Sequence, residues 1–208
     1  MTNRMMMRVA ALSAGLLLGG CALTTDRIDL SYSVPAGVAP VNGASAITVA
    51  VEVSDQRADK TKVSSKKNGF GMEMAPILAN EDVALTVRRA IEQNLSARGF
   101  RTGAAGASVK VDAGLTRFYN DHKLGFFAGD AVAELNMNVS VRGRDGSVIY
   151  ARQVVAQGTE PNTQLATGEN ARLALNRALE SGMKQLFEDR VFLDALTGKR
   201  PPAGTAAL

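Results

Sequence analysis

Residues 133–157, AELNMNVSVRGRDGSVIYARQVVAQ, decide the fold of this 208-residue chain. Apolar residues alternate with polar ones on the N-terminal side of the Asp145-Gly146 pair, and strand-forming residues follow it from Val148. Alternation is typical of a β-strand with one buried face, and an Asp-Gly pair accepts the positive φ that a tight hairpin turn requires. The stretch therefore predicts two antiparallel, neighbouring strands, each with one wet face.

Two further strands share this alternation, at residues 46–54 and 109–116. A strand is also predicted around residues 72–78, and weaker alternation at residues 28–34 indicates an edge strand. Residues 58–71 are rich in lysine, serine and glycine, which predicts an exposed loop.

Two long helices complete the pattern. Asn80, Glu81 and Asp82 predict a helix start, Gly99 predicts its end, and a second helix is expected from about Gly168 to Asp189, with a helical turn at residues 192–196. Strands with one polar face need helices on the other face. We therefore expect an α+β fold: a two-layer α/β sandwich in which a largely antiparallel sheet of four to five strands carries both long helices on one face. Residues 46–198 would form this single domain, and residues 199–208 a flexible tail.

The first 20 residues predict an export signal. Arg4 and Arg8 precede an apolar run at residues 9–18, and two glycines precede Cys21, the only cysteine. Cleavage before Cys21 would leave 22 basic residues against 20 acidic ones, because only Arg4 and Arg8 are lost from the 24 basic residues. That balance argues against nucleic acid as a partner.

The sequence Leu18-Gly19-Gly20-Cys21 resembles the lipobox of bacterial lipoproteins. The resemblance implies that Cys21 receives a diacylglyceryl group and an N-linked acyl chain such as palmitate, which together anchor the protein to a membrane. Ala22, in place of the aspartate that retains lipoproteins in the inner membrane, implies the outer membrane, facing the periplasm. Residues 21–45 would then be a lipidated N-terminus and tether. The alternative is an ordinary signal peptide that happens to precede a cysteine.

Three further stretches extend this resemblance. They are Val51-Glu-Val-Ser-Asp55-Gln56-Arg57, Leu95-Ser-Ala-Arg98-Gly99-Phe100 and the C-terminal helix. Together with the lipobox they resemble the YajG family of bacterial outer-membrane lipoproteins over residues 18–197. Residues 123–129 and the proline-rich tail depart from the family pattern. The resemblance implies an outer-membrane lipoprotein and no defined biochemical role.

Two segments are candidate partner-binding sites. Asp55, Gln56 and Arg57 lie where the strand at residues 46–54 meets a loop; they form either a contact site or a structural pair in which aspartate holds arginine and fixes the loop. Phe126 and Phe127 lie in a turn between two strands, where they would insert into a lipid or a partner's pocket, or fold back over the end of the sheet.

The remaining polar residues favour no catalytic chemistry. His122, the only histidine, lacks a nucleophile motif and metal-ligand spacing, so it is predicted to be a solvent-facing loop residue. The lysines at 60, 62, 66 and 67 are interpreted as solvent-exposed loop residues, or as residues that bind anionic lipid head groups. We therefore expect no enzyme, no cofactor and no metal site.

These features predict a lipid-anchored lipoprotein that acts as a non-catalytic binding or accessory module for an envelope protein complex or component. Its partners would be the membrane, through the lipid on Cys21, and an envelope protein or lipid. One alternative is a carrier that shields a lipid or other apolar ligand between helices and sheet, and a remote alternative is a hydrolytic enzyme.

Overall fold

The computed structural model describes residues 23–123, 125 and 128–198. The predicted export signal, Cys21, Phe126, Phe127 and the tail at residues 199–208 lie outside the described residues, so the predictions made for them stay predictions. In chain order the elements are β1 (Asp26–Ile28), η2 (Ala44–Ala46), β2 (Thr48–Asp55), β3 (Ser64–Lys67), β4 (Glu73–Ala79), α2 (Val83–Ala97), β5 (Arg101–Thr102), β6 (Val109–Lys123), β7 (Gly129–Gly143), β8 (Val148–Thr163), α3 (Gly168–Glu188) and α4 (Arg190–Leu196).

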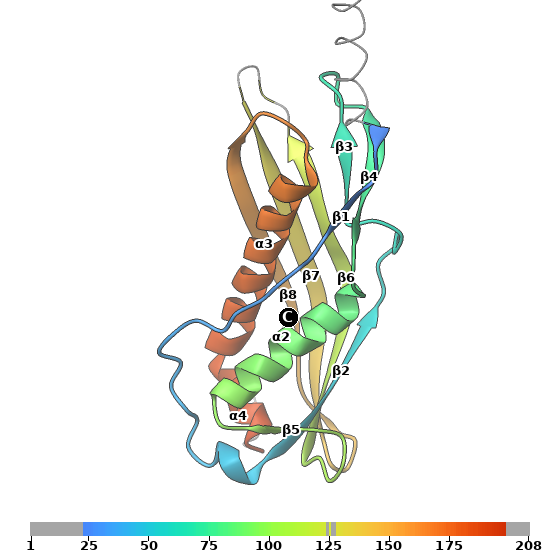
Figure 1. Cartoon of the computed structure of the whole chain (residues 1–208). Helices are drawn as coiled ribbons and strands as arrows, with labels where there is room; N and C mark the ends of the chain where they lie inside the picture. The colour runs from blue at the N-terminus through green and yellow to red at the C-terminus, as the bar shows by residue number, and fades with distance from the viewer. Residues whose placement is uncertain (1–22, 124, 126–127, 199–208) are drawn as a thin grey trace, which may run out of the picture.

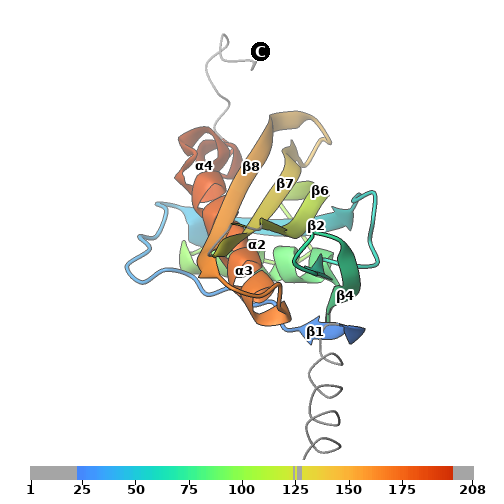
Figure 2. The same cartoon turned by 90° about the horizontal axis from the view of Figure 1, so that it is seen from above.

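The predicted α+β class is confirmed. A five-stranded sheet, in the order β5-β2-β6-β7-β8, is curled like half a barrel, and α2 and α3 lie within its curve (Figures 1 and 2). A second sheet, in the order β1-β4-β3, stands at one end of the molecule (Figure 1). The core fills the space between the helices and the concave face of the larger sheet, which leaves its convex face open.

The prediction of a two-layer sandwich with one largely antiparallel sheet is confirmed only in part, because the structure has two sheets and both are mixed. Strands β6, β7 and β8 are antiparallel neighbours, as the Asp-Gly turn predicts, but β2 pairs in parallel with both β5 and β6. Parallel neighbours need a crossover connection, and here the chain forms β3, β4 and α2 before it returns to the sheet. Side chains alternate with the same period in parallel and antiparallel strands, so the sequence pattern carried no sign of the difference.

Both predicted long helices are confirmed. The Asp82 side chain caps α2 by accepting hydrogen bonds from the backbone N–H groups of Ala84 and Leu85, and Gly99, at a φ of 89°, follows its end. Helix α3 packs closely on β8 at Gly158, where an added Cβ would lie 2.2 Å from the backbone nitrogen of Ala178. This contact has no room for a side chain, so it fixes the distance between the helix and the sheet.

The segments predicted as a tether and as a loop contain β1 and β3 of the second sheet, and β4 confirms the strand predicted around residues 72–78. Strand β1 lies within residues 21–45 and pairs in parallel with β4, and Leu30 and Tyr32 pack against the core. Strand β3 lies within residues 58–71, the predicted exposed loop, and its Ser64 and Lys66 are buried. Lys66 looks like a surface residue in sequence, but its ammonium group pairs with the Asp26 carboxylate at 2.7 Å while its aliphatic stem is covered. Folded structure therefore begins well before residue 46.

The prediction that His122 faces solvent from a loop is also wrong. His122 lies in β6 opposite Ala131, only 3% of it is exposed, and neither ring nitrogen has a hydrogen-bond partner among the described residues. A bulge between Leu115 and Arg117 shifts the side-chain alternation of β6 by one residue. The strand consequently continues beyond the point at which its sequence pattern breaks.

Burial lowers the pKa of His122 from 6.5 to about 4, an effect that the nearby Asp121 charge opposes and the Lys67 charge reinforces. Below pH 6.5 the His122 imidazole binds a proton in the unfolded chain but stays neutral in the folded chain. The free energy of unfolding therefore falls as the pH falls toward 4. We expect the free energy of unfolding to drop by about 2 kcal/mol between pH 7 and pH 5, as measured by urea denaturation. His122→Leu should remove this slope because the chain has one histidine. An equal slope in the variant would contradict the assignment.

Candidate functional site

Asp55 and Arg57 form an ion pair where β2 ends. The Arg57 Nη2 lies 2.9 Å from Asp55 Oδ2, and Arg57 Nε donates to both carboxylate oxygens, at 3.0 and 3.2 Å. Both side chains are largely buried. Burial raises the pKa of Asp55, but the hydrogen bonds and charge of Arg57 outweigh it, so the pKa lies below its ordinary value. The pair is therefore ionised at neutral pH.

The same guanidinium group joins three parts of the chain. Arg57 Nη1 donates to the backbone carbonyl oxygens of Lys62, at 3.2 Å, and of Phe118 in β6, at 3.3 Å, while Nη2 reaches the carbonyl of Lys60 at 3.4 Å. This is the geometry of the structural interpretation, in which aspartate holds arginine and arginine fixes the loop.

Gln56 lies on the opposite side of the strand, on the open face of the sheet. Its side-chain amide covers Gly114 of β6, where an added Cβ would lie 2.7 Å from the amide nitrogen, and it donates a hydrogen bond to Ser54 Oγ at 3.0 Å. The three predicted residues are thus divided: Asp55 and Arg57 are part of the packing, and Gln56 is exposed.

A shallow depression of about 210 Å³ surrounds this glutamine. We call it the open-face depression, and it is lined by Glu52, Ser54, Gln56, Asp112, Ala113, Gly114, Asn138 and Ser140. Sequence reasoning named Gln56 but missed the residues from β6 and β7. The available signal was Gly114, a glycine inside an alternating strand, which often marks a bulge or a close approach.

The charges beside the depression pair with one another across the strands. Lys110 Nζ lies 2.6 Å from Glu52 and 2.8 Å from Asp112, and Arg142 Nε lies 3.2 Å from Asp112. The hydrogen bonds that Lys110 donates to Asp112 and Glu52 raise the pKa of Lys110. Amides and hydroxyls are therefore the groups that the depression offers to a partner, and they select by hydrogen bonding more than by net charge.

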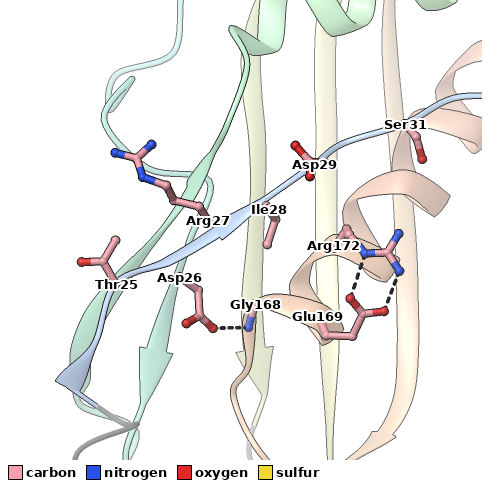
Figure 3. A pocket seen from close by; sticks show the side chains of 9 residues that line it. All are labelled: Thr25, Asp26, Arg27, Ile28, Asp29, Ser31, Gly168, Glu169 and Arg172. Carbon is pink, nitrogen blue, oxygen red and sulfur yellow. Dashed lines mark hydrogen bonds and ion pairs between the residues drawn. The ribbon is translucent and has the colours of Figure 1, made fainter.

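A larger hollow of about 630 Å³ lies between β1 and the start of α3 (Figure 3). Its polar groups bind one another: Asp26 Oδ2 accepts from the Gly168 N–H at 2.9 Å, and Arg172 Nε donates to Glu169 at 2.9 Å. The first bond fastens β1 to the start of α3, whereas the second lies within α3. The polar groups of the hollow are therefore used in packing.

A cleft of about 820 Å³ with a mainly apolar lining lies between α2, α3 and the segment at residues 32–38. The Asn94 amide donates to the Tyr32 hydroxyl at 2.7 Å, and Arg98 lies over the Phe187 ring at 4.5 Å. Burial raises the pKa of Tyr32 and lowers that of Arg98. An apolar ligand would fit in this cleft.

Residues 23–123, 125 and 128–198 contain neither a metal-ligand cluster nor a membrane-spanning helix. They hold no group of three or more His, Cys, Asp or Glu side chains placed to bind a metal ion. They contain no helix that is both long enough and apolar enough to cross a membrane.

The chain resembles several solved bacterial proteins in fold, at low sequence identity. Protein XCC0632 from Xanthomonas campestris has a TM-score of 0.55 and 14% identity, covering 85% of this chain and 97% of that one. A minor lipoprotein from Acinetobacter baumannii has a TM-score of 0.39 and 12% identity, covering 69% and 92%. Lipoprotein GNA1162 from Neisseria meningitidis has a TM-score of 0.38 and 11% identity, covering 69% and 99%.

The sequence itself identifies the family. A family model described as "Uncharacterized lipoprotein" matches residues 35–197, most of the chain, and the protein belongs to that family. No curated protein sequence matches it.

The two roles within the Asp55-Gln56-Arg57 motif can be separated by substitution. Arg57→Ala leaves a buried carboxylate and three carbonyl oxygens without their partner, so we expect a loss of about 3 to 5 kcal/mol in the free energy of unfolding. Gln56→Ala removes an exposed amide and should change it by less than about 0.5 kcal/mol. Urea denaturation of both variants measures this. Equal stabilities for the two variants would show that the ion pair does not hold the junction.

Proposed function

We propose that this lipoprotein is a YajG-type protein, held in the outer membrane by lipids on Cys21 and facing the periplasm, where it acts as a non-catalytic binding or accessory module for an envelope protein complex. Three observations support this cellular location: the family match, the lipobox that ends at Cys21, and Ala22 after it. The module contacts its partner through the open face of the sheet.

The observation that carries the binding role is the open-face depression. One face of the curled sheet is covered by α2 and α3, and the other is uncovered along β2, β6 and β7 (Figure 2). On that face Gly114 leaves room for the Gln56 amide to lie against β6, and Gln56, Asn138 and Ser140 place donors and acceptors in the depression. A rigid sheet with a small polar depression suits recognition of a protein surface, because its backbone needs little reordering on binding.

A carrier of a lipid or other apolar ligand is the second candidate. The cleft between α2, α3 and residues 32–38 favours it, because Val34, Pro35, Val38 and Met183 contribute apolar surface there. Arg98 at its edge would pair with an acidic head group.

The anchor is tested by changing the cysteine. Two acyl chains already give stable anchoring to a bilayer, and the third strengthens it. Cys21→Ala should therefore move the protein from the membrane fraction to the soluble fraction when cell fractions are compared by immunoblot. Retention of the variant in the membrane fraction would refute lipidation as the anchor.

The binding role is tested by photo-crosslinking in intact cells. A photo-reactive phenylalanine replaces Gln56 in one strain, and in the matched control it replaces Gln185, which is exposed on α3 on the other side of the sheet. A third strain carries it at Ser181, which lines the apolar cleft. Adducts are identified by mass spectrometry.

We expect a discrete protein adduct from position 56 and none from position 185. A lipid adduct from position 181, without a protein adduct from position 56, would favour the carrier instead. The same adducts from positions 56 and 185 would show that the open face is not a specific binding surface.

A further inference from the structure

Exposed apolar side chains gather at one end of the molecule. Phe70 is 90% exposed and Leu23 is 64% exposed, and Met72 and Met74 are also exposed. We call these four residues the hairpin patch, because Phe70 lies in the β3–β4 turn, Met72 and Met74 follow it, and Leu23 precedes β1. The connection between β8 and α3, which carries the exposed Leu165, lies at the same end (Figure 1). A cluster of exposed apolar groups on a soluble domain marks an interaction surface.

The turn that carries Phe70 is an ordered one. The Asn68 side-chain oxygen accepts hydrogen bonds from the backbone N–H groups of Phe70 and Met72, both at 3.0 Å, and Asn68 N–H donates to the Met72 carbonyl at 3.0 Å. Gly71 supplies the positive φ, 82°, that the turn requires. The turn thus presents an aromatic ring at its apex, so the exposure of Phe70 is part of a defined conformation.

The lipid attachment point is close to this patch. Strand β1 runs parallel to β4 with Asp26 opposite Ile77, so the residues before Asp26 lead back toward the β3–β4 turn. Thr24 confirms the direction, because its hydroxyl accepts a hydrogen bond from Lys66 of β3 at 3.4 Å. Cys21 is two residues before Leu23, which limits their separation to about 7 Å. Acyl chains on Cys21 would hold the hairpin patch at the bilayer surface.

We propose that the hairpin patch is a membrane-docking surface: Leu23, Phe70, Met72 and Met74 insert among the lipids beside the Cys21 anchor. This inference rests on the lipidation included in the proposed function. The β7–β8 turn at the opposite end of the molecule would then point away from the membrane (Figure 1).

A bilayer fits this surface better than a second copy of the chain. A stable protein interface buries about 800 Å² on each partner and needs a broad, complementary surface. The hairpin patch instead projects as a narrow turn with flexible thioether side chains around one ring. A fluid lipid phase accommodates such a shape without complementarity, and the nearby anchor keeps the two in contact.

The absence of tryptophan from the chain makes docking directly measurable. Phe70→Trp places a single fluorophore in the patch of the lipidated full-length protein, and Val148→Trp places one beside the β7–β8 turn, where an apolar side chain is also exposed. Both proteins are reconstituted into vesicles of phosphatidylethanolamine and phosphatidylglycerol, with and without brominated acyl chains. Flotation of the vesicles checks that the protein is attached.

We expect the F70W emission to shift to the blue on reconstitution and to lose most of its intensity with brominated lipid, while the V148W emission stays at its solution wavelength without quenching. F70W emission that matches V148W on vesicles that carry the protein would overturn docking and leave the anchor intact. Failure of the protein to float with vesicles would overturn the anchor itself, and docking with it. A concentration-dependent blue shift of the unlipidated C21A/F70W protein without vesicles would assign the patch to self-association instead.

Discussion

The ion pair between Asp55 and Arg57 stands where the two sheets of this lipoprotein meet. Strand β2 ends there, and Arg57 holds carbonyl oxygens from the following loop and from β6. Further along β6, the Ser64 hydroxyl donates to the backbone carbonyl oxygen of Asn120 and accepts from the Asn120 side-chain amide, which joins β3 to the same strand. The position of the small sheet, and with it the hairpin patch, therefore depends on polar contacts made in a largely buried place. Such contacts specify geometry because each unpaired partner is costly.

The elements that the sequence predicted well are those with a long, unbroken pattern. Helices α2 and α3 have continuous apolar stripes, and β7 and β8 have alternation interrupted by an Asp-Gly turn. The failures have physical causes of their own. Strand β3 consists of Ser-Ser-Lys-Lys, whose burial depends on partners distant in sequence, and β6 carries a bulge that reverses its pattern before His122. The parallel pairing of β2 has no signature in the sequence of β2 itself, because the crossover connection determines which strand it pairs with.

Of the residues that line the open-face depression, the sequence predicted only Gln56. The motif Asp55-Gln56-Arg57 is continuous in sequence, but a strand directs successive side chains to opposite faces. The Gln56 side chain therefore lies on the other face from those of Asp55 and Arg57. The surface around Gln56 is completed by Gly114, Asn138 and Ser140, which come from two other strands. Their meeting follows from the register of β2, β6 and β7, and register is set by tertiary pairing.

The positions of the hairpin patch and the open-face depression on the molecule explain how both could act together. The hairpin patch lies at an end of the molecule, whereas the open-face depression lies along its side on β2, β6 and β7 (Figure 1). An acyl anchor alone leaves a domain free to rotate, and a second contact beside the anchor removes much of that freedom. The open face of the sheet would then point sideways, parallel to the membrane, at a fixed distance from the bilayer. A partner embedded in or bound to the same membrane meets it at high effective concentration and with a smaller loss of orientational freedom, so a shallow polar depression can suffice for specific contact.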